Sequence, residues 1–361
     1  RAPGAVTRIV HYGDSPTTAD MITGDTRRLL QKQFGDAGHG FCLVGKPWAW
    51  YDHNGVAIQA SEWTVDPASQ AKVRDGFFGL GGVSFRGGTS AATRITLKES
   101  GHESIEISFL RLPGGGEFTV HADDKLMGTV QTLDKTLSPG FAEFPVPSSA
   151  RHFRIQVTAG VVRMFGVLFH KHSPGIEYDS LGLNGAYISV LAKMFDEKHW
   201  AEQLRRRKPD LVIINYGTNE SGYAAFVDKV FAKELSEAVR RVRAALPEAS
   251  ILLMSPMDRG QRETGGAIGT YPTIPRLVTI QQQVALETGC AFFNTFLAMG
   301  GPGTMGRWYE AEPRLVGGDF IHPMPAGARI VGNLLYQALF DGYNRFKVRR
   351  MQERFARMAK K

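Results

Sequence analysis

Apolar residues recur with two different periods along this chain, and the period changes twice. Residues 7–12 read as a short strand running into a turn, and residues 20–34 place apolar side chains at helical spacing. Between about 45 and 170, short alternating runs replace the helical period, and Gly- and Pro-rich turns separate them. After residue 172, strand and helix alternate again. The pattern therefore predicts an α/β part that is interrupted by a β part.

The alternating runs predict strands at 93–97, 104–109, 117–121, 140–144, 152–157 and 161–169. Short strands with turns every 8–15 residues are typical of an antiparallel β-sandwich. In the later part, the continuous apolar run at 210–215 is typical of a parallel strand buried on both faces. Further strands are expected at 251–254 and 291–293, and helices at 186–195, 226–246, 274–288 and 326–340.

These elements predict an α/β fold, a doubly wound parallel sheet with an antiparallel β-sandwich inserted after its first helix. The predicted domains are a discontinuous catalytic domain at 1–44 and 173–345, a β-sandwich insert at 45–172, and a basic tail at 346–361. At 361 residues, the chain is long enough for two such domains.

The net charge of +8 is confined to one end of the chain. Residues 345–361 hold eight Lys and Arg residues against Glu353 alone, which leaves a net charge of only +1 for the rest. A near-neutral body argues against nucleic acid as a partner. The tail is expected either to be a solvated helix end or to contact an anionic polymer or a membrane surface.

The composition excludes several other classes of protein. Hydrophobic residues at 43% and charged residues at 22% are near globular averages, and no apolar run reaches 18 residues. Two cysteines cannot by themselves form a zinc cluster, and both lie in apolar surroundings. Since no signal peptide is evident at the start, the protein is expected to be cytosolic or to have lost its signal peptide.

Three polar loops follow predicted strand ends or precede the last helix, and ligands bind at strand ends in such sheets. Gly13-Asp14-Ser15 follows the first strand, where a serine hydroxyl is exposed but needs a base to react. Asn219 follows the most apolar strand and offers an amide donor. Asp319 precedes His322 by three residues, a spacing at which a carboxylate can accept the imidazole N–H and fix its tautomer.

These loops resemble the conserved blocks of the SGNH (GDSL-type) hydrolases. Gly13-Asp14-Ser15 matches the first block, Gly185 the second, Gly217-Thr218-Asn219 the third, and Asp319 with His322 the fifth. Pro16 and Glu220 stand where the family pattern has Leu and Asp. The match covers about 60% of the chain, everything except the β insert and the tail. The sequence around the first block looks like that of bacterial periplasmic peptidoglycan O-acetylesterases that carry an inserted β domain.

The resemblance implies a flavodoxin-like sheet and a serine esterase mechanism. Ser15 would be the nucleophile, His322 its general base, and Asp319 the residue that orients His322. The backbone N–H groups of Ser15 and Gly185 and the amide of Asn219 would form the oxyanion hole. Neither a metal nor another cofactor is expected. The resemblance also favours a periplasmic or secreted location.

The expected substrate is an O-acetylated carbohydrate polymer, peptidoglycan first and other acetylated glycans second. Trp48 and Trp50 lie at the start of the insert, where aromatic rings are suited to stack on sugars or to pack in a domain junction. Two alternatives stay open: an O-acyltransferase that passes the acyl group to a sugar hydroxyl through the same triad, and a non-catalytic glycan-binding protein.

Overall fold

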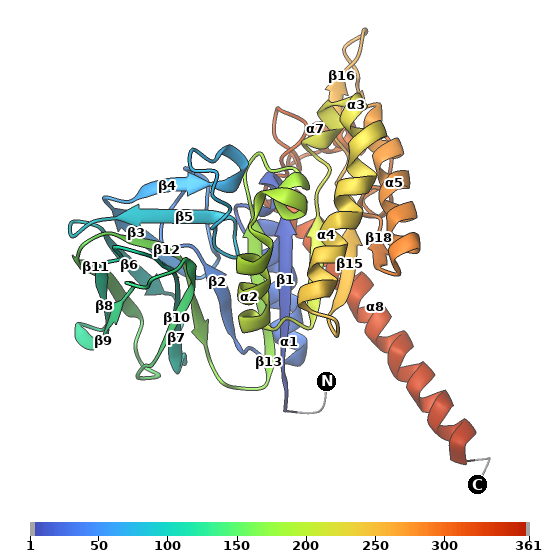
Figure 1. Cartoon of the computed structure of the whole chain (residues 1–361). Coiled ribbons are helices and arrows are strands. Elements are labelled where there is room, and N and C mark those ends of the chain that lie inside the picture. Colours follow the sequence, from blue (N-terminus) through green and yellow to red (C-terminus); the bar gives the residue numbers. More distant parts are fainter. Residues whose placement is uncertain (1–3, 359–361) are drawn as a thin grey trace.

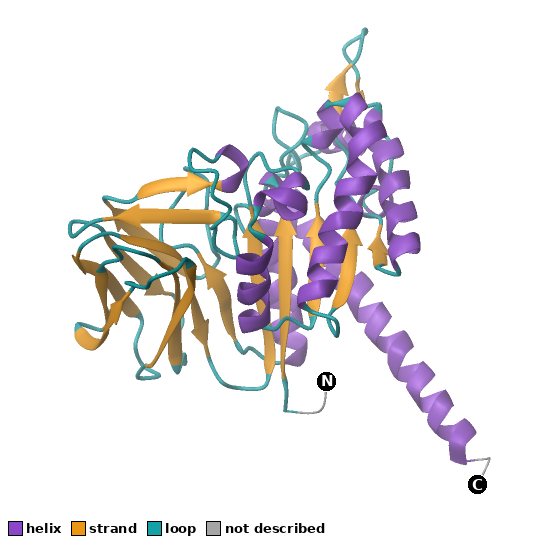
Figure 2. Cartoon of the chain, in the orientation of Figure 1, coloured by secondary structure: helices purple, strands orange, loops and turns teal. Residues whose placement is uncertain are grey.

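A five-stranded parallel sheet forms the centre of the molecule (Figures 1 and 2). The computed structural model describes residues 4–358. The strand order is β13 (Gly175–Gly182), β1 (Val6–Gly13), β14 (Leu211–Asn215), β15 (Ser250–Met254) and β18 (Ala291–Phe293). Numbered within this sheet, the order is 2-1-3-4-5, as in flavodoxin-like folds. The predicted fold class is confirmed.

The two faces of the parallel sheet are covered by different helices (Figure 1). On β1 and β14, apolar side chains alternate between two buried clusters, because successive residues of a strand point to opposite faces. Ile9 and Ile213 belong to the cluster that includes Ile22 and Val331 from two neighbouring helices. On the other face, Val10 packs in a cluster with side chains of three more helices. Both faces of the sheet are therefore buried at these two strands, as expected of a doubly covered sheet.

The longer helices are α1 (Met21–Phe34), α2 (Glu197–Arg207), α4 (Ala232–Ala245), α5 (Thr273–Thr288), α7 (Thr304–Glu310) and α8 (Pro325–Met358). Shorter turns are η1 (Ser15–Thr17), η2 (Ala68–Gln70), η3 (Val190–Met194), η4 (Glu220–Gly222), α3 (Ala224–Phe226), η5 (Val227–Phe231) and α6 (Thr295–Ala298). Helices α1 and α8 pack together on one face, and α2, α4 and α5 lie on the other. The helix predicted at 186–195 is only the short turn η3, and the one predicted at 326–340 continues to Met358.

Two antiparallel sheets form the rest of the molecule. One has the order β10 (Ser138–Pro145), β7 (Ser104–Arg111), β12 (Val162–His170), β5 (Val83–Gly87), β4 (Thr64–Pro67), with β2 (Gly38–Cys42) also on β12. The other has the order β3 (Val56–Ser61), β6 (Ala92–Leu97), β11 (His152–Ala159), β8 (Glu117–Ala122), β9 (Lys125–Gln131). A small hairpin of β16 (Gly260–Arg262) and β17 (Ile268–Thr270) projects near α7 (Figure 1).

Aromatic side chains join the two antiparallel sheets face to face. Phe109 on β7 meets Phe118 on β8 with ring centroids 5.5 Å apart, and Phe153 on β11 meets Phe169 on β12 at 4.9 Å. All four rings are buried. The antiparallel sheets are consistent with an inserted β domain, and the six strands predicted for this segment are present. The domain boundaries remain a prediction, and β2, which falls within predicted segment 1–44, pairs with β12.

Buried charges join the parallel sheet to the antiparallel part. On the edge strand β13, Glu177 and Asp179 are almost fully buried and both bind Arg207 of α2, at 2.7 Å and 2.6 Å. Glu177 also binds His170 of β12 at 2.5 Å, and Asp179 accepts the backbone N–H of Phe41 on β2 at 2.9 Å. This network, hereafter the β13 ion network, lies where strands of both kinds of sheet meet one helix.

Removing Arg207 from the β13 ion network should destabilise the whole fold. We expect Arg207→Leu to lower the free energy of unfolding by about 3–5 kcal/mol, because it leaves the buried Asp179 without its cationic partner and Glu177 with only the partly exposed Arg8 and His170. The exposed Arg205 on the same helix provides the control, and Arg205→Leu should change stability by less than about 0.5 kcal/mol. Urea unfolding of the three proteins measures the difference. Similar values for both variants would contradict the prediction.

Candidate active site

The register of three parallel strands brings three loops to one point. Gly13 of β1 lies beside Gly182 of β13 on one side and Asn215 of β14 on the other. The chain reverses strand order between β1 and β14, which is where ligands bind in such sheets. A Cβ on Gly13 would lie 2.3 Å from Thr17 Oγ1, so glycine lets the loop containing Ser15 fold back over the end of its strand.

Ser15, His322 and Asp319 form a connected chain of hydrogen bonds. His322 Nε2 lies 2.7 Å from Ser15 Oγ, and His322 Nδ1 lies 2.6 Å from Asp319 Oδ2. The carboxylate can only accept, so Nδ1 carries the proton and Nε2 is left as an acceptor for the serine hydroxyl. The side chains of His322 and Asp319 are 46% and 49% exposed. The structure thus brings the three predicted residues together in a shallow, open site.

The Asp319 carboxylate is held in its ionised form by the turn around it. Burial raises its pKa, but the hydrogen bonds from the His322 ring and from the N–H groups of Ile321 and His322 outweigh burial and leave the pKa lowered. Phe320 makes this turn possible with a left-handed φ of 59°. The Phe320 ring packs edge-on against the Tyr309 ring, with centroids 4.9 Å apart. This packing fixes Phe320, which lies in the turn between Asp319 and His322.

Asp14 links the loop of Ser15 to the loop after β14. It is buried, and its Oδ2 accepts the backbone N–H of Thr218 at 3.2 Å. Burial raises the pKa of Asp14 to about 6, although hydrogen bonds from Thr218 and the charge of His322 act in the opposite direction. Sequence reasoning treated Asp14 only as part of a motif, because nothing in the sequence shows that its side chain turns inward.

Asn219 and Gly185 lie on adjacent loops beside the serine. The Asn219 side chain donates one hydrogen to the carbonyl of Ala186 at 2.9 Å, which leaves its second amide hydrogen for another acceptor. Gly185 adopts φ of 66°, a left-handed conformation that favours glycine. Within residues 4–358, the Gly185 N–H donates to no other atom of the chain. Two of the three predicted oxyanion donors, Gly185 and Asn219, are therefore held on two loops that hydrogen bond to each other.

Glu220 fixes the position of this pair of loops. It is fully buried, and its Oε1 accepts the backbone N–H of Ile188 at 2.7 Å. Burial is the largest influence and raises the pKa of Glu220 to about 8, against the opposing hydrogen bond from Ile188. At neutral pH, the side chain is therefore a neutral carboxylic acid. The sequence pointed only to a departure from the family pattern at this position.

The aromatic residues that could bind substrate differ in how far they are buried. Trp48 packs against the main core with its ring 6.2 Å from that of Tyr51, whereas Trp50 is exposed. Among the described contacts, none joins either tryptophan to Ser15, Asp319 or His322. Closer in sequence to the oxyanion loops, Tyr187 and the exposed Tyr223 have ring centroids 6.1 Å apart. Sequence reasoning did not single out this tyrosine pair.

The fold and the assembled site define the SGNH class of hydrolases. Residues 157–330 match the sequence profile of the GDSL-like Lipase/Acylhydrolase family. The chain therefore carries a domain of this family, which confirms the resemblance inferred from its motifs, and its class of activity is that of an acyl esterase. A search of curated proteins finds no match.

Among solved structures, one described as a peptidoglycan O-acetylesterase in action superposes with a TM-score of 0.80 at 23% identity. The alignment covers 94% of this chain and 92% of the other. This likeness is one of fold. A family two carbohydrate esterase from Clostridium thermocellum, in complex with cellohexaose, aligns with a TM-score of 0.34 at 14% identity. That alignment covers 84% of this chain and 99% of the other.

The role of Glu220 can be tested through the pH dependence of stability. A folded-state pKa of about 8, above the ordinary 4.5, means that the folded protein holds this proton more tightly than the unfolded chain. Stability should therefore fall as pH rises from about 4.5 to about 8. Glu220→Gln keeps the acceptor for Ile188 without the titration, so its stability should fall less.

Urea unfolding near pH 6.5 and near pH 9 measures this difference, and the titration of Asp14 is common to the wild type and Glu220→Gln. Glu220→Ala serves as the contrasting variant, because it removes the acceptor for Ile188 and should reduce esterase rate as well as stability. Parallel pH dependence in the wild type and Glu220→Gln would show that Glu220 is already ionised in the folded protein.

Proposed function

We propose that the protein is a serine esterase that removes O-acetyl groups from a carbohydrate polymer, with peptidoglycan as the first candidate and other acetylated glycans as the second. The observation that carries this proposal is the unbroken chain from Asp319 through His322 to Ser15, with both hydrogen bonds shorter than 2.8 Å. A serine hydroxyl paired with an oriented imidazole is the arrangement that activates a nucleophile for acyl transfer.

The reaction follows from these positions. Ser15 Oγ attacks the ester carbonyl while His322 Nε2 accepts its proton, and the ionised Asp319 stabilises the resulting imidazolium. The N–H groups of Ser15 and Gly185 and the free amide hydrogen of Asn219 supply donors for the oxyanion. Collapse of the tetrahedral intermediate releases the sugar hydroxyl, which takes the proton from His322. Water then repeats the sequence on the acetyl-enzyme and releases acetate.

The openness of the site favours hydrolysis of a large substrate. Because the Asp319 and His322 side chains are about half exposed, water reaches the acyl-enzyme freely. An acyltransferase must instead keep water from its acyl-enzyme, so this exposure disfavours the alternative with the same triad. The intact hydrogen-bonded triad likewise disfavours a purely glycan-binding protein. Acetylated cell-wall and plant polymers lie outside the cytoplasm, and the proposed location is accordingly periplasmic or secreted.

Removing the nucleophile should abolish activity without affecting the fold. Ser15→Ala is expected to leave less than a tenth of the acetate release from an aryl acetate and from O-acetylated peptidoglycan, since triad members act as a unit. A fluorophosphonate reagent should label the wild type at Ser15 and leave the variant unlabelled. Acetate release across a panel of acetylated peptidoglycan and xylan, with and without an acceptor sugar, then ranks the substrates and separates esterase from transferase.

Two exposed aromatic residues, Tyr223 and Trp50, should matter for polymer only. We expect Tyr223→Ala and Trp50→Ala to raise KM for an acetylated polymer several-fold and to leave aryl acetate turnover and melting temperature unchanged, because stacking on sugars is a binding effect. Trp48→Ala is the contrasting variant: its ring packs in the core, so it should lower the melting temperature. Equal losses on both substrates would assign Tyr223 and Trp50 to structure instead.

A further inference from the structure

The last part of α8 leaves the body of the molecule. Up to Tyr343, the helix packs against α1, where the Tyr343 and Phe340 rings lie 5.3 Å and 6.3 Å from that of Phe34. From residue 345 to 358, every side chain is exposed, and Figure 1 shows this stretch projecting as a free helix. We call residues 345–358 the projecting helix. Lys360 and Lys361, which belong to the predicted basic tail, lie outside the described residues.

The projecting helix has an apolar strip along one side. Val348, Met351, Phe355 and Met358 follow one another at intervals of three, four and three residues, which places them on one face of a helix. Their side chains are between 49% and 65% exposed. A solvated helix end does not require such a strip, so the alternative of a merely solvated tail leaves this feature unexplained.

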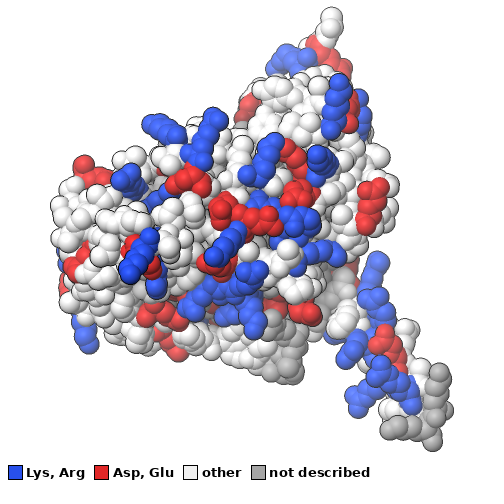
Figure 3. Space-filling model, in the orientation of Figure 1, with Lys and Arg blue, Asp and Glu red and all other residues white. Residues whose placement is uncertain are grey.

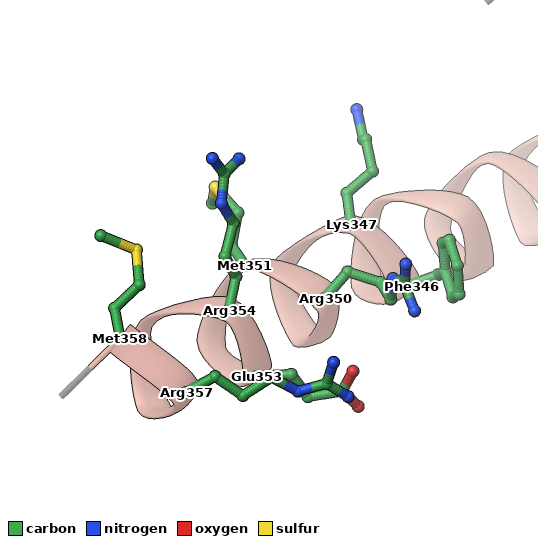
Figure 4. Close-up of a pocket in the computed structure, with 8 residues that line it drawn as sticks. All are labelled: Phe346, Lys347, Arg350, Met351, Glu353, Arg354, Arg357 and Met358. Carbon is green, nitrogen blue, oxygen red and sulfur yellow. The ribbon is translucent and has the colours of Figure 1, made fainter. Parts of the chain in front are cut away.

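Basic side chains border the strip. Lys and Arg side chains gather along the projecting helix in Figure 3, and Figure 4 shows Lys347 and Arg354 on the same side as Met351 and Met358. The basic residues of this stretch are Arg345, Lys347, Arg349, Arg350, Arg354 and Arg357, and Glu353 is its one acidic residue. The natural partner is therefore anionic, but it must also accept apolar side chains.

Three kinds of partner differ in how well they meet both requirements. A second copy of this helix would bring two strongly positive helices together, and like charges disfavour that pairing. An anionic polysaccharide would match the charge but would leave the apolar strip in water. A bilayer that contains anionic lipids offers phosphates at the level of the basic side chains and acyl chains just beneath them.

We propose that the projecting helix binds the surface of an anionic lipid bilayer, lying in the interface with its apolar strip toward the acyl chains. A search of the described residues finds no helix with the length and apolar character needed to cross a membrane. Because α8 begins next to His322 and runs back along the sheet, its projecting end leaves at the edge opposite the triad (Figure 1). Its 34 residues span about 50 Å along the helix axis, so the triad lies at the opposite end of α8 from the stretch that binds lipid.

Co-sedimentation of the full chain with vesicles tests this proposal independently of the esterase assignment. We expect binding to phosphatidylcholine vesicles that contain about 30% phosphatidylglycerol, and at least about tenfold weaker binding to phosphatidylcholine alone. Binding should weaken with added salt. Met351→Ser/Phe355→Ser and Arg350→Glu/Arg354→Glu should each reduce binding at least about tenfold. Leu286→Ser, an exposed apolar position on α5, is the matched control and should bind like the wild type.

Each alternative gives a different result. If charge reversal abolishes binding but the strip variant binds normally, the helix recognises polyanions only and the proposal fails. If wild type self-associates in sedimentation velocity and the strip variant does not, the strip joins two copies and the proposal fails. No binding to anionic vesicles also overturns it. Aryl acetate turnover should be the same in all these variants, so loss of esterase activity and loss of binding are separate outcomes.

Discussion

The buried carboxylates of β13 are the constraint on which the rest of this structure depends. Glu177 and Asp179 lie on the strand between two kinds of sheet. The guanidinium of Arg207 binds both of them, and Arg8 gives Glu177 a second cationic partner at 2.9 Å. Their other hydrogen bonds fix β2 and β12 relative to the same strand. Because β13 leads into the loop that carries Gly185, the network also supports the position of this predicted oxyanion donor.

Most of the architecture could be predicted from hydrophobic periods, because doubly covered parallel strands and half-buried antiparallel strands leave different patterns. Strand β13 was not predicted, since Glu177 and Asp179 interrupt its apolar run and Arg207 lies far along the chain. Helix α2 was not predicted for a related reason. Five of its eleven residues are Lys, Arg or His, and two of these, His199 and Arg207, are buried where an apolar residue would be expected. The length of α8 was underestimated because its last turns have no body to pack against.

The residues of the candidate site also fall into two groups, those that the sequence predicts and those that only the structure shows. Ser15, Asp319 and His322 could be predicted from motifs, because the proposed chemistry uses their side chains directly. Asp14 and Glu220 could not, because their importance rests on being turned inward. Each accepts a backbone N–H from a neighbouring loop, so each acts through geometry that a sequence does not show. The exposure of the Asp319 and His322 side chains also becomes evident only in three dimensions.

The spacing of the triad along the chain has a consequence for biosynthesis. Ser15 and His322 are separated by 307 residues, and the turn that holds His322 comes just before the last helix. In a nascent polypeptide, Ser15 is therefore made long before its hydrogen-bond partner His322. Until His322 is made and its turn packs beside the parallel sheet, the Ser15 hydroxyl has no imidazole to accept its proton.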